Sequence, residues 1–295
     1  MEYIDQRQIS RQSWKFYACL LAWPLYLFMI PYAFHLLGWW SLFFMIFPGA
    51  WLFSWVAYLM HESWHKYVPG VPSDLFYYLF GFMLITDPQI YRLVHGSHHA
   101  RVHTWKDVEF HPWGKIEPKA LRRLYNLMEI VFGSIFLQLV TTLRVPFQRR
   151  YKKRFRLWLA LVSPLVWLLF LGSIGWASYR VFGLAHTEVG VSYMLAYFWG
   201  SLFQHNSQLI EHGNLITEGK WKERTIKTRN LRSDGVLEKL FLFLTHNDSR
   251  EHVLHHTLVR VYSRPFPGQV PLPQEAVFIT LRDYLKIAWG MITEG

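Results

Sequence analysis

Residues 16–60 read FYACLLAWPLYLFMIPYAFHLLGWWSLFFMIFPGAWLFSWVAYLM, and this stretch indicates the fold class because it contains no Asp, Glu, Lys or Arg. About 20 apolar residues are enough to cross the hydrocarbon core of a bilayer. The stretch is therefore long enough for two helices, with a break at Gly38 and spans at residues 16–37 and 39–60. We expect these two spans to form a hairpin with a very short turn.

Two later apolar stretches, at residues 157–176 and 191–210, predict a second hairpin. Shorter apolar stretches at residues 75–86 and 130–143 are flanked by polar or basic segments and predict interfacial or re-entrant helices. The predicted fold is thus an all-α integral membrane protein with four transmembrane helices in two hairpins. Residues 61–156 and 211–295 would form a helical cytoplasmic cap that carries the histidines, and residues 1–295 a single domain.

The positive charges predict the orientation in the membrane. Of the 31 Lys and Arg residues, 15 lie between residues 61 and 156 and 12 more follow His212, whereas the two predicted outer connections hold only Arg180. The positive-inside rule then places both termini, both polar segments and the active site on the cytoplasmic side. Contact with anionic lipid headgroups explains the net charge of +11 better than a nucleic-acid site does. Cys19 is the single cysteine, which excludes an internal disulfide and a cysteine-ligated cluster.

The spacing of the histidines predicts a metal site. A separation of four residues or of three places two imidazoles on one face of a helix, as a shared metal requires. One such pair and two H-x-x-H-H triplets occur in the chain, and they lie at the predicted cytoplasmic face. The eight histidines concerned are His61, His65, His95, His98, His99, His252, His255 and His256. We expect His212, at the cytoplasmic end of the fourth span, to be a ninth ligand in preference to His205, which lies deeper.

The remaining histidines have other predicted roles. His103 and His246 lie near the motifs and are candidates to hydrogen bond to the ligands rather than to bind metal. His35, His111 and His186 are expected to have no metal role. Acidic residues beside the motifs are expected to accept hydrogen bonds from the outer nitrogens of the ligand rings or to remain ordinary solvated charges. They are Glu62, Asp107, Glu109, Asp248 and Glu251.

The number of ligands implies two metal ions, because a protein zinc site usually takes four ligands and this set offers eight or nine. Imidazole suits iron, copper, nickel or zinc, so the residues leave the metal open. A histidine-based metal transporter is a further possibility. Transport would favour ionisable residues in the middle of the spans, and the predicted spans lack them.

Three motifs resemble the histidine boxes of the membrane fatty acid desaturase superfamily. They are H-E-S-W-H at residues 61–65, H-G-S-H-H at residues 95–99 and H-V-L-H-H at residues 252–256. The predicted layout of spans and boxes resembles the same family over nearly the whole chain. H-E-S-W-H-K at residues 61–66 and I-E-H-G at residues 210–213 also resemble alkane monooxygenases, and K-D-V-E-F-H at residues 106–111 resembles desaturases and carotenoid ketolases.

This resemblance implies an enzyme that holds two irons and uses dioxygen to oxidise a long aliphatic chain taken from the membrane. Desaturation is the favoured outcome. The alternatives are hydroxylation of an alkane or fatty acid, oxidative decarboxylation to a terminal alkene, and oxidation of a carotenoid ring. Because the chain has no fused electron carrier, the resemblance implies an external ferredoxin, rubredoxin or cytochrome as electron donor.

Three further segments carry predictions. A tunnel for the aliphatic chain would be lined by aromatic residues of the spans, although many such residues merely pack helices together. The candidates are Trp51, Trp55, Tyr58, Tyr197 and Phe198. The proline-rich segment at residues 264–273 predicts a loop over the cytoplasmic mouth, and residues 274–292 predict an amphipathic helix on the membrane surface.

Overall fold

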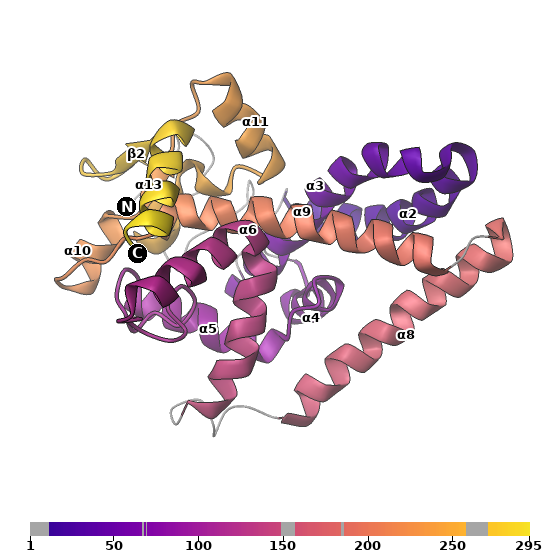
Figure 1. The fold of residues 1–295 in the computed structure, drawn as a ribbon, viewed down its shortest axis with the longest axis horizontal. Coiled ribbons are helices and arrows are strands. Elements are labelled where there is room, and N and C mark those ends of the chain that lie inside the picture. The colour runs from indigo at the N-terminus through magenta and orange to yellow at the C-terminus, as the bar shows by residue number, and fades with distance from the viewer. Residues whose placement is uncertain (1–11, 67, 69, 149–156, 184–185, 258–270) are drawn as a thin grey trace.

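The described residues of this computed structural model are 12–66, 68, 70–148, 157–183, 186–257 and 271–295. Helices make up most of this part of the chain, as predicted (Figure 1). Long helices extend to one end of the molecule, and short helices gather at the other end, where α10, α11 and α13 lie (Figure 1).

The first hairpin forms as the sequence predicts. Helix α2 (Trp14–Leu37) ends at Gly38, the short 3-10 helix η1 (Gly38–Trp40) makes the turn, and α3 (Ser41–His65) follows. Gly38 has φ of 55°, in the left-handed region that glycine adopts without a steric penalty. The predicted break at Gly38 is therefore confirmed.

Helices α8 (Leu157–Phe182) and α9 (His186–His212) include the two later apolar stretches and extend each of them. By length and composition, two helical stretches of the described residues could cross a membrane. One is Trp14–His65, which contains α2 and α3, and the other is Lys119–Arg144.

Helix α6 (Lys119–Arg144) is longer than predicted. Residues 130–143 were expected to form a short interfacial or re-entrant helix, but they are part of a 26-residue helix that begins 11 residues earlier, at Lys119. Its backbone is broken at Gly133, with φ of 55° and ψ of −138°. Ser201 of α9 spans the break: its Oγ accepts a hydrogen bond from Ile135 N at 2.9 Å and donates to Phe132 O at 3.3 Å.

Helices α3 and α9 pack closely because small residues line their contact. A Cβ atom on Gly49 would lie 2.5 Å from Ala196 Cβ, and one on Gly200 would lie 2.5 Å from Phe53 Cβ. Small residues permit such close approach between helices in membranes, where dispersion contacts rather than hydrophobic burial hold helices together. The order of the contacts makes the two helices parallel. Their C-terminal ends, which carry His61, His65 and His212, therefore lie at the same end of the pair.

Aromatic rings fill the interior between α2, α3 and α9. Trp23 meets Phe53 edge-on with ring centroids 4.6 Å apart, and it meets Tyr193 edge-on at 5.7 Å. Such edge-to-face pairs contribute about 0.5–1.5 kcal/mol each beyond the area that they bury. These aromatic rings pack beside the closest contact between α3 and α9 and so fix the rotation of each helix relative to the other.

The remaining elements are short. The helices are α4 (Ser73–Met83), α5 (Pro88–Arg101), α10 (Trp221–Ile226), α11 (Val236–Leu244), α12 (His252–Thr257) and α13 (Leu281–Thr293), with the 3-10 helices η2 (Val145–Phe147) and η3 (Asp248–Arg250). Helix α4 matches the short helix predicted at residues 75–86. Two three-residue strands, β1 (Arg229–Leu231) and β2 (Val277–Ile279), pair in parallel and depart from the all-α prediction.

The C-terminal helix is shorter than predicted. A helix was expected over residues 274–292, but α13 begins at Leu281 because Thr280 and Asp283 form a capping box, in which Thr280 Oγ1 accepts from Asp283 N. The preceding residues are extended in β2. One face of α13 is buried through Tyr284, Ala288 and Met291. Residues 258–270, which include most of the predicted proline-rich loop, lie outside the described residues.

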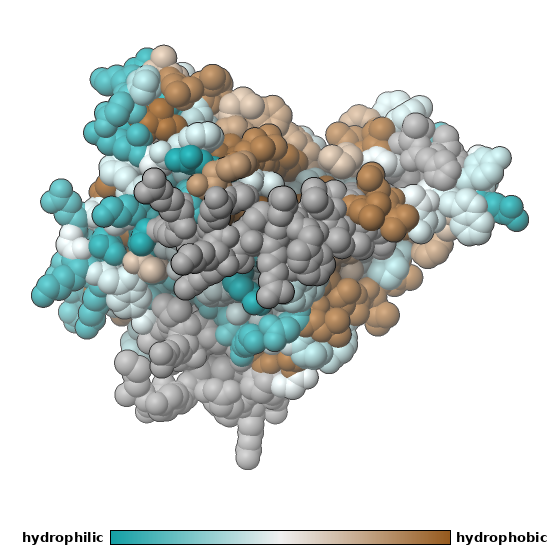
Figure 2. Space-filling model, turned by 90° about the horizontal axis from the view of Figure 1, so that it is seen from below, coloured by the Kyte–Doolittle hydropathy of each residue, from teal (hydrophilic) through white to brown (hydrophobic). Residues whose placement is uncertain are grey.

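The surface is divided by polarity. On the face shown in Figure 2, hydrophilic residues gather at the end where α10 lies, and several hydrophobic patches lie nearer the opposite side. Helix α2 exposes large apolar side chains such as Leu21 and Leu25, which are 67% and 64% exposed. Contiguous exposed apolar surface of this kind is typical of contact with lipid or with another protein.

Candidate metal centre

Helix α5 presents one of the histidine triplets because its start is fixed. Asp87 caps the helix: its Oδ1 accepts from Gln89 N at 2.8 Å and from Ile90 N at 3.1 Å, and Pro88 occupies the first turn. This arrangement satisfies backbone donors that would otherwise have no partner. His95 and His99 then lie one turn apart on one face of α5, and His98 points to a neighbouring face.

The second triplet is carried by α12, a helix of only six residues, and the strand pair holds it in place. Asn230 of β1 accepts a hydrogen bond from Val253 N at 3.0 Å through Oδ1, and its Nδ2 donates to Val277 O of β2 at 3.0 Å. One asparagine side chain thus connects α12 to both strands. Since so short a helix is not stable alone, these contacts position His252, His255 and His256.

The first cluster contains five histidines from α3, α5 and α12. Its ligand atoms all lie within 4.8 Å of one another, and its members are His61, His65, His95, His99 and His255. His95 Nε2 lies 3.2 Å from His65 Nε2 and 3.0 Å from His99 Nε2, and His99 Nε2 lies 3.0 Å from His255 Nε2. Two nitrogens bound at right angles to one ion at about 2.1 Å are about 3.0 Å apart. The spacing therefore suits a single metal ion.

Two further groups of possible ligands share His212, and together they are called the second cluster here: one is His98, His212 and His256, and the other is Glu211, His212 and His252. His256 Nε2 lies 3.3 Å from His98 Nε2 and 3.2 Å from His212 Nε2. Glu211 Oε2 lies 3.2 Å from His252 Nε2 and 3.8 Å from His212 Nε2. Both clusters are close together, since His98 and His99 are neighbours on α5 and His255 and His256 are neighbours on α12.

Three of the predicted acidic residues lie behind the ligand histidines. Asp107 Oδ2 accepts from His98 Nδ1 at 2.7 Å, Glu109 Oε2 from His95 Nδ1 at 3.0 Å, and Glu62 Oε1 from His61 Nδ1 at 3.3 Å. A proton held on Nδ1 leaves the Nε2 lone pair free to bind a metal ion. The hydrogen bond from this proton to the carboxylate also makes Nε2 a stronger electron-pair donor to the metal.

The other two predicted acidic residues are Asp248 and Glu251. Asp248 Oδ2 accepts a hydrogen bond from Gln204 Nε2 at 2.8 Å and lies near His252 at the wall of a cavity. Glu251 is half-buried and, among the described residues, makes no side-chain contact with a ligand histidine. The role of Glu251, as a hydrogen-bond acceptor for a ligand ring or as an ordinary solvated charge, stays a prediction.

His103 lies behind His212 in the same way. His212 Nδ1 is 3.0 Å from His103 Nε2, and His103 Nδ1 is 2.9 Å from the backbone carbonyl of Arg224. A carbonyl can only accept, so His103 carries its proton on Nδ1, its Nε2 accepts from His212 Nδ1, and His212 Nε2 faces the second cluster with its lone pair. His103 is therefore a hydrogen-bonding neighbour of a ligand, which is one of the roles that the sequence suggested.

Burial keeps most of these rings neutral. It lowers the pKa values of His95, His99, His255 and His256 well below the ordinary value, and neighbouring imidazoles lower them further. His98 differs, because Asp107 and Glu109 more than offset the effect of burial and raise its pKa. Burial raises the pKa of Glu109 to about 7. Neutral imidazole is the form that binds a metal ion.

The other histidines lie outside both clusters. His205 Nε2 donates to Glu129 Oε1 at 3.2 Å, and His246 Nε2 lies 3.0 Å from the backbone carbonyl of Trp51. His111 packs against Trp105, and His35 is exposed on α2. The structure does not describe the side chain of His186.

Sequence reasoning missed Glu211 as a member of the site. It is fully buried and faces two ligand histidines, one of which is its neighbour His212. The signal was present in I-E-H-G at residues 210–213, where a charged residue stands at the end of an apolar helix. Burial of a carboxylate is costly unless a cation or donors compensate for it, and a metal ion would do so here.

An inner cavity lies between the clusters and the helices. Residues of both clusters line it, together with Met60, Leu84, Gln138 and Gln204, and it contains about 610 Å³ of empty space including its opening. The aromatic residues predicted to form a tunnel do not line this cavity. Trp51 and Trp55 pack on His246, and Tyr58 and Tyr197 are buried in the aromatic interior. Their size made them suitable for packing helices together, which is the role they have.

Taken together, the geometry defines a helical protein with a buried, histidine-rich site for metal ions. A family model described as fatty acid desaturase matches residues 37–264 of the chain. The chain therefore belongs to the fatty acid desaturase family. A search of curated proteins and a search of solved structures give no match.

Proposed function

We propose that this protein is a membrane di-iron oxidoreductase that uses dioxygen to oxidise a fatty acyl chain, most readily by desaturation. One observation carries the proposal: nine histidines and one carboxylate form two adjacent clusters beside a cavity, in a chain of the fatty acid desaturase family. The proposed ligands are His61, His65, His95, His99 and His255 for one iron, and His98, His212, His252 and His256, with Glu211, for the other.

The donor set fits two irons better than the alternatives considered. Five imidazoles exceed the four ligands that zinc usually takes, and imidazole with one carboxylate is a ligand set that iron accepts. When bound, the two irons would supply the activation of dioxygen with electrons delivered by an external ferredoxin, rubredoxin or cytochrome. The described chain has a single, buried cysteine, so it offers no cysteine-ligated electron carrier of its own.

The residues of the chain have three roles in this mechanism. Asp107, Glu109 and Glu62 hold a proton at Nδ1 of their histidines and so keep the Nε2 lone pairs directed at the metals. His61 and His65 are partly exposed and the other members of both clusters are buried, which would limit the access of bulk water to the metals. The inner cavity would hold one segment of the chain beside the metals, where its position selects which C–H bond reacts.

We further propose four membrane spans at residues 16–37, 39–60, 157–176 and 191–210, with the metal centre on the cytoplasmic side and the entire chain as one domain. The parallel packing of α3 and α9 supports this topology. Both helices would cross in the same direction, and both end in ligand histidines, His61 and His212. The short connection between α2 and α3 leaves little room for residues outside the membrane.

The test is product analysis in membranes that contain the chain, an iron supply and a ferredoxin system, with His255→Ala as the inactive control. Desaturation predicts new unsaturated acyl chains that disappear in the variant. Alcohols in their place would assign hydroxylation, and terminal alkenes would assign oxidative decarboxylation. Absence of any oxidised product, with about two zinc ions bound per chain, would contradict the proposal.

A further inference from the structure

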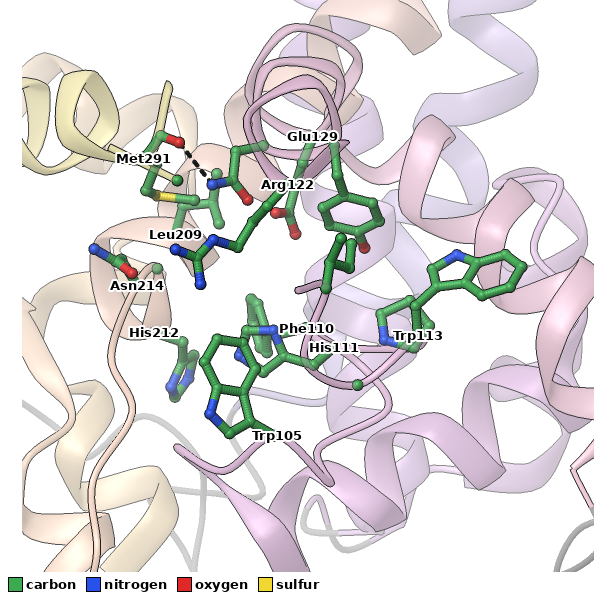
Figure 3. Close-up of a pocket in the computed structure, with 17 residues that line it drawn as sticks. Trp105, Phe110, His111, Trp113, Arg122, Glu129, Leu209, His212, Asn214 and Met291 are labelled. Atoms are coloured by element: carbon green, nitrogen blue, oxygen red, sulfur yellow. Dashed lines mark hydrogen bonds between the residues drawn. The ribbon is translucent and has the colours of Figure 1, made fainter. Parts of the chain in front are cut away.

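A second cavity, here called the outer cavity, adjoins the inner one and shares Phe110 and His212 with it (Figure 3). It is formed by the start of α6, the end of α9, the end of α13 and the segment at residues 105–116, and it contains about 540 Å³ of empty space including its opening. Its walls combine aromatic rings with one cation. The residues that matter here are Trp105, Phe110, Trp113, Arg122, Tyr125 and His212.

Arg122 directs its guanidinium group into this cavity, between Asn214 and Trp105 (Figure 3). No ion pair joins it to a carboxylate of the described residues, and its Nε is buried without a hydrogen-bond partner, although the C-terminal residue Gly295 lines the cavity beside it. Glu129 also lines the cavity, but its Oε1 accepts from His205 Nε2 at 3.2 Å. The N–H group of Arg122 Nε, which is buried without an acceptor, costs free energy unless a ligand provides the acceptor.

Tyr125 adds a second donor to the same cavity. Its hydroxyl is also buried without a hydrogen-bond partner, and it lies one turn of α6 beyond Arg122. Two donors of this kind on one face of a helix suit an acceptor-rich anion. A carboxylate has two oxygens that match the planar guanidinium group.

The start of α6 strengthens the preference for an anion. Its first turns carry Lys119, Arg122 and Arg123, and its first turn contains no acidic residue. The N-terminal end of a helix is already the positive end of its dipole, so basic residues there are unfavourable unless a negative group compensates. The charge at this position is therefore better explained by a bound anion than by the stability of the helix.

The position of the cavity indicates where the rest of such a ligand goes. Phe110 and His212 line both the outer and the inner cavity, so a single layer of side chains separates the two. His212 is a proposed metal ligand and is held by His103, whereas Phe110 is packed on the rings of His98 and His205 and is held by no hydrogen bond of its side chain, so its ring is the part of this layer that a ligand would have to displace. An aliphatic chain that passes Phe110 would enter the inner cavity beside both metal clusters.

We propose that the outer cavity binds the carboxylate of a free fatty acid through Arg122 and Tyr125, and that the aliphatic tail passes Phe110 into the inner cavity. The position of the tail beside the metals rests on the proposed function. The carboxylate site itself does not, because it stands on Arg122, Tyr125 and the charge at the start of α6. The substrate is then the free acid rather than a thioester or a phospholipid.

The experiment compares the binding of dodecanoic acid and dodecan-1-ol to the metal-loaded full chain in nanodiscs at pH 8, measured by equilibrium dialysis. The variants are Arg122→Met, Arg122→Lys and the matched control Arg123→Met, whose side chain is exposed on the same helix. The intact protein is expected to bind the acid at least about tenfold more tightly than the alcohol, because charge-assisted hydrogen bonds are the stronger ones. Arg122→Met should abolish this preference, Arg122→Lys should retain part of it, and Arg123→Met should leave it unchanged.

Two results would overturn the proposal: no preference for the acid in the intact protein, or a preference that survives Arg122→Met. Metal content and products measured on the same samples separate this outcome from a failure of the proposed function. An Arg122-dependent preference without any oxidised product supports the carboxylate site and counts against the function. Oxidised products with no dependence of binding on Arg122 support the function and overturn the site.

Discussion

The two histidine clusters are built from the same two helical triplets but differ in what completes them. The first cluster adds His61 and His65 of α3, so that all five members are imidazoles. The second adds His212 and the neighbouring carboxylate Glu211 of α9, and its ring at position 212 is held by His103. The first cluster is thus uniform in chemistry, whereas the second combines neutral and anionic donors. We infer that the two metals differ in affinity and in response to acid.

The largest expected effect comes from removing one ligand of each cluster in turn. His255→Ala opens the first cluster and His256→Ala opens the second, and each should lower the rate of product formation about 1000-fold or more, since both metals are needed. Product analysis by mass spectrometry measures the loss. His35→Ala, on the exposed surface of α2, is the matched control and should keep full activity. Retention of activity in either cluster variant would mean that one metal suffices.

A smaller effect is expected from the carboxylates. Glu211→Gln keeps the size of the side chain but removes its charge, so the affinity of the second metal should fall about 100-fold while the first is retained. Glu62→Gln, which removes the partner of His61, should instead lower the affinity of the first metal by about tenfold. Competition with a chelator of known affinity measures both. Equal losses from both metals in Glu211→Gln would argue against separate clusters.

The contact between His103 and His212 predicts a weaker change. His103→Ala leaves His212 Nδ1 without its acceptor, and the affinity of the second metal should fall about tenfold. His103→Gln supplies a side-chain oxygen that can accept the same hydrogen bond and should restore part of the loss. The same chelator competition applies. If Ala and Gln behave alike, the ring fills space and does not orient His212.

The smallest effect is a difference in acid sensitivity between the clusters. Four buried histidines have lower pKa values in the folded chain than in the unfolded chain, so the unfolded state binds more protons as the pH falls. The folding stability is therefore unaffected by these groups above about pH 6.5 and decreases below it. The four are His95, His99, His255 and His256. The raised pKa of His98 lets a proton compete with the second metal at a higher pH. Stepwise acidification with metal analysis should release the second metal first, and the reverse order would contradict this assignment.

The parts of this structure that could be predicted are those encoded over one or two helical turns. The histidine pair and the two triplets supply all five members of the first cluster and three of the second, because spacing within a helix determines which side chains share a face. The break at Gly38 was predictable from one glycine in a long apolar stretch. His212 required the further argument that the end of the fourth span lies at the same face as the boxes.

The parts that could not be predicted depend on contacts between distant segments. The strand pair joins residues 229–231 to residues 277–279 and is too short to produce a periodic pattern. The position of Glu211 at the end of an apolar helix was a signal in the sequence, but its burial results from the packing of α9 against α12 and β1, which the sequence does not show. The outer cavity likewise arises from the approach of α6, α9 and α13, and Arg122 alone does not indicate it.

The most direct test of the central claim is the metal content of the purified chain together with X-ray absorption at the iron edge. The account predicts two irons per chain with a first shell dominated by imidazole nitrogen, one iron remaining in His255→Ala and one remaining in His256→Ala. A single metal in the intact protein, or the loss of both metals together in each variant, would contradict the existence of two separate histidine clusters.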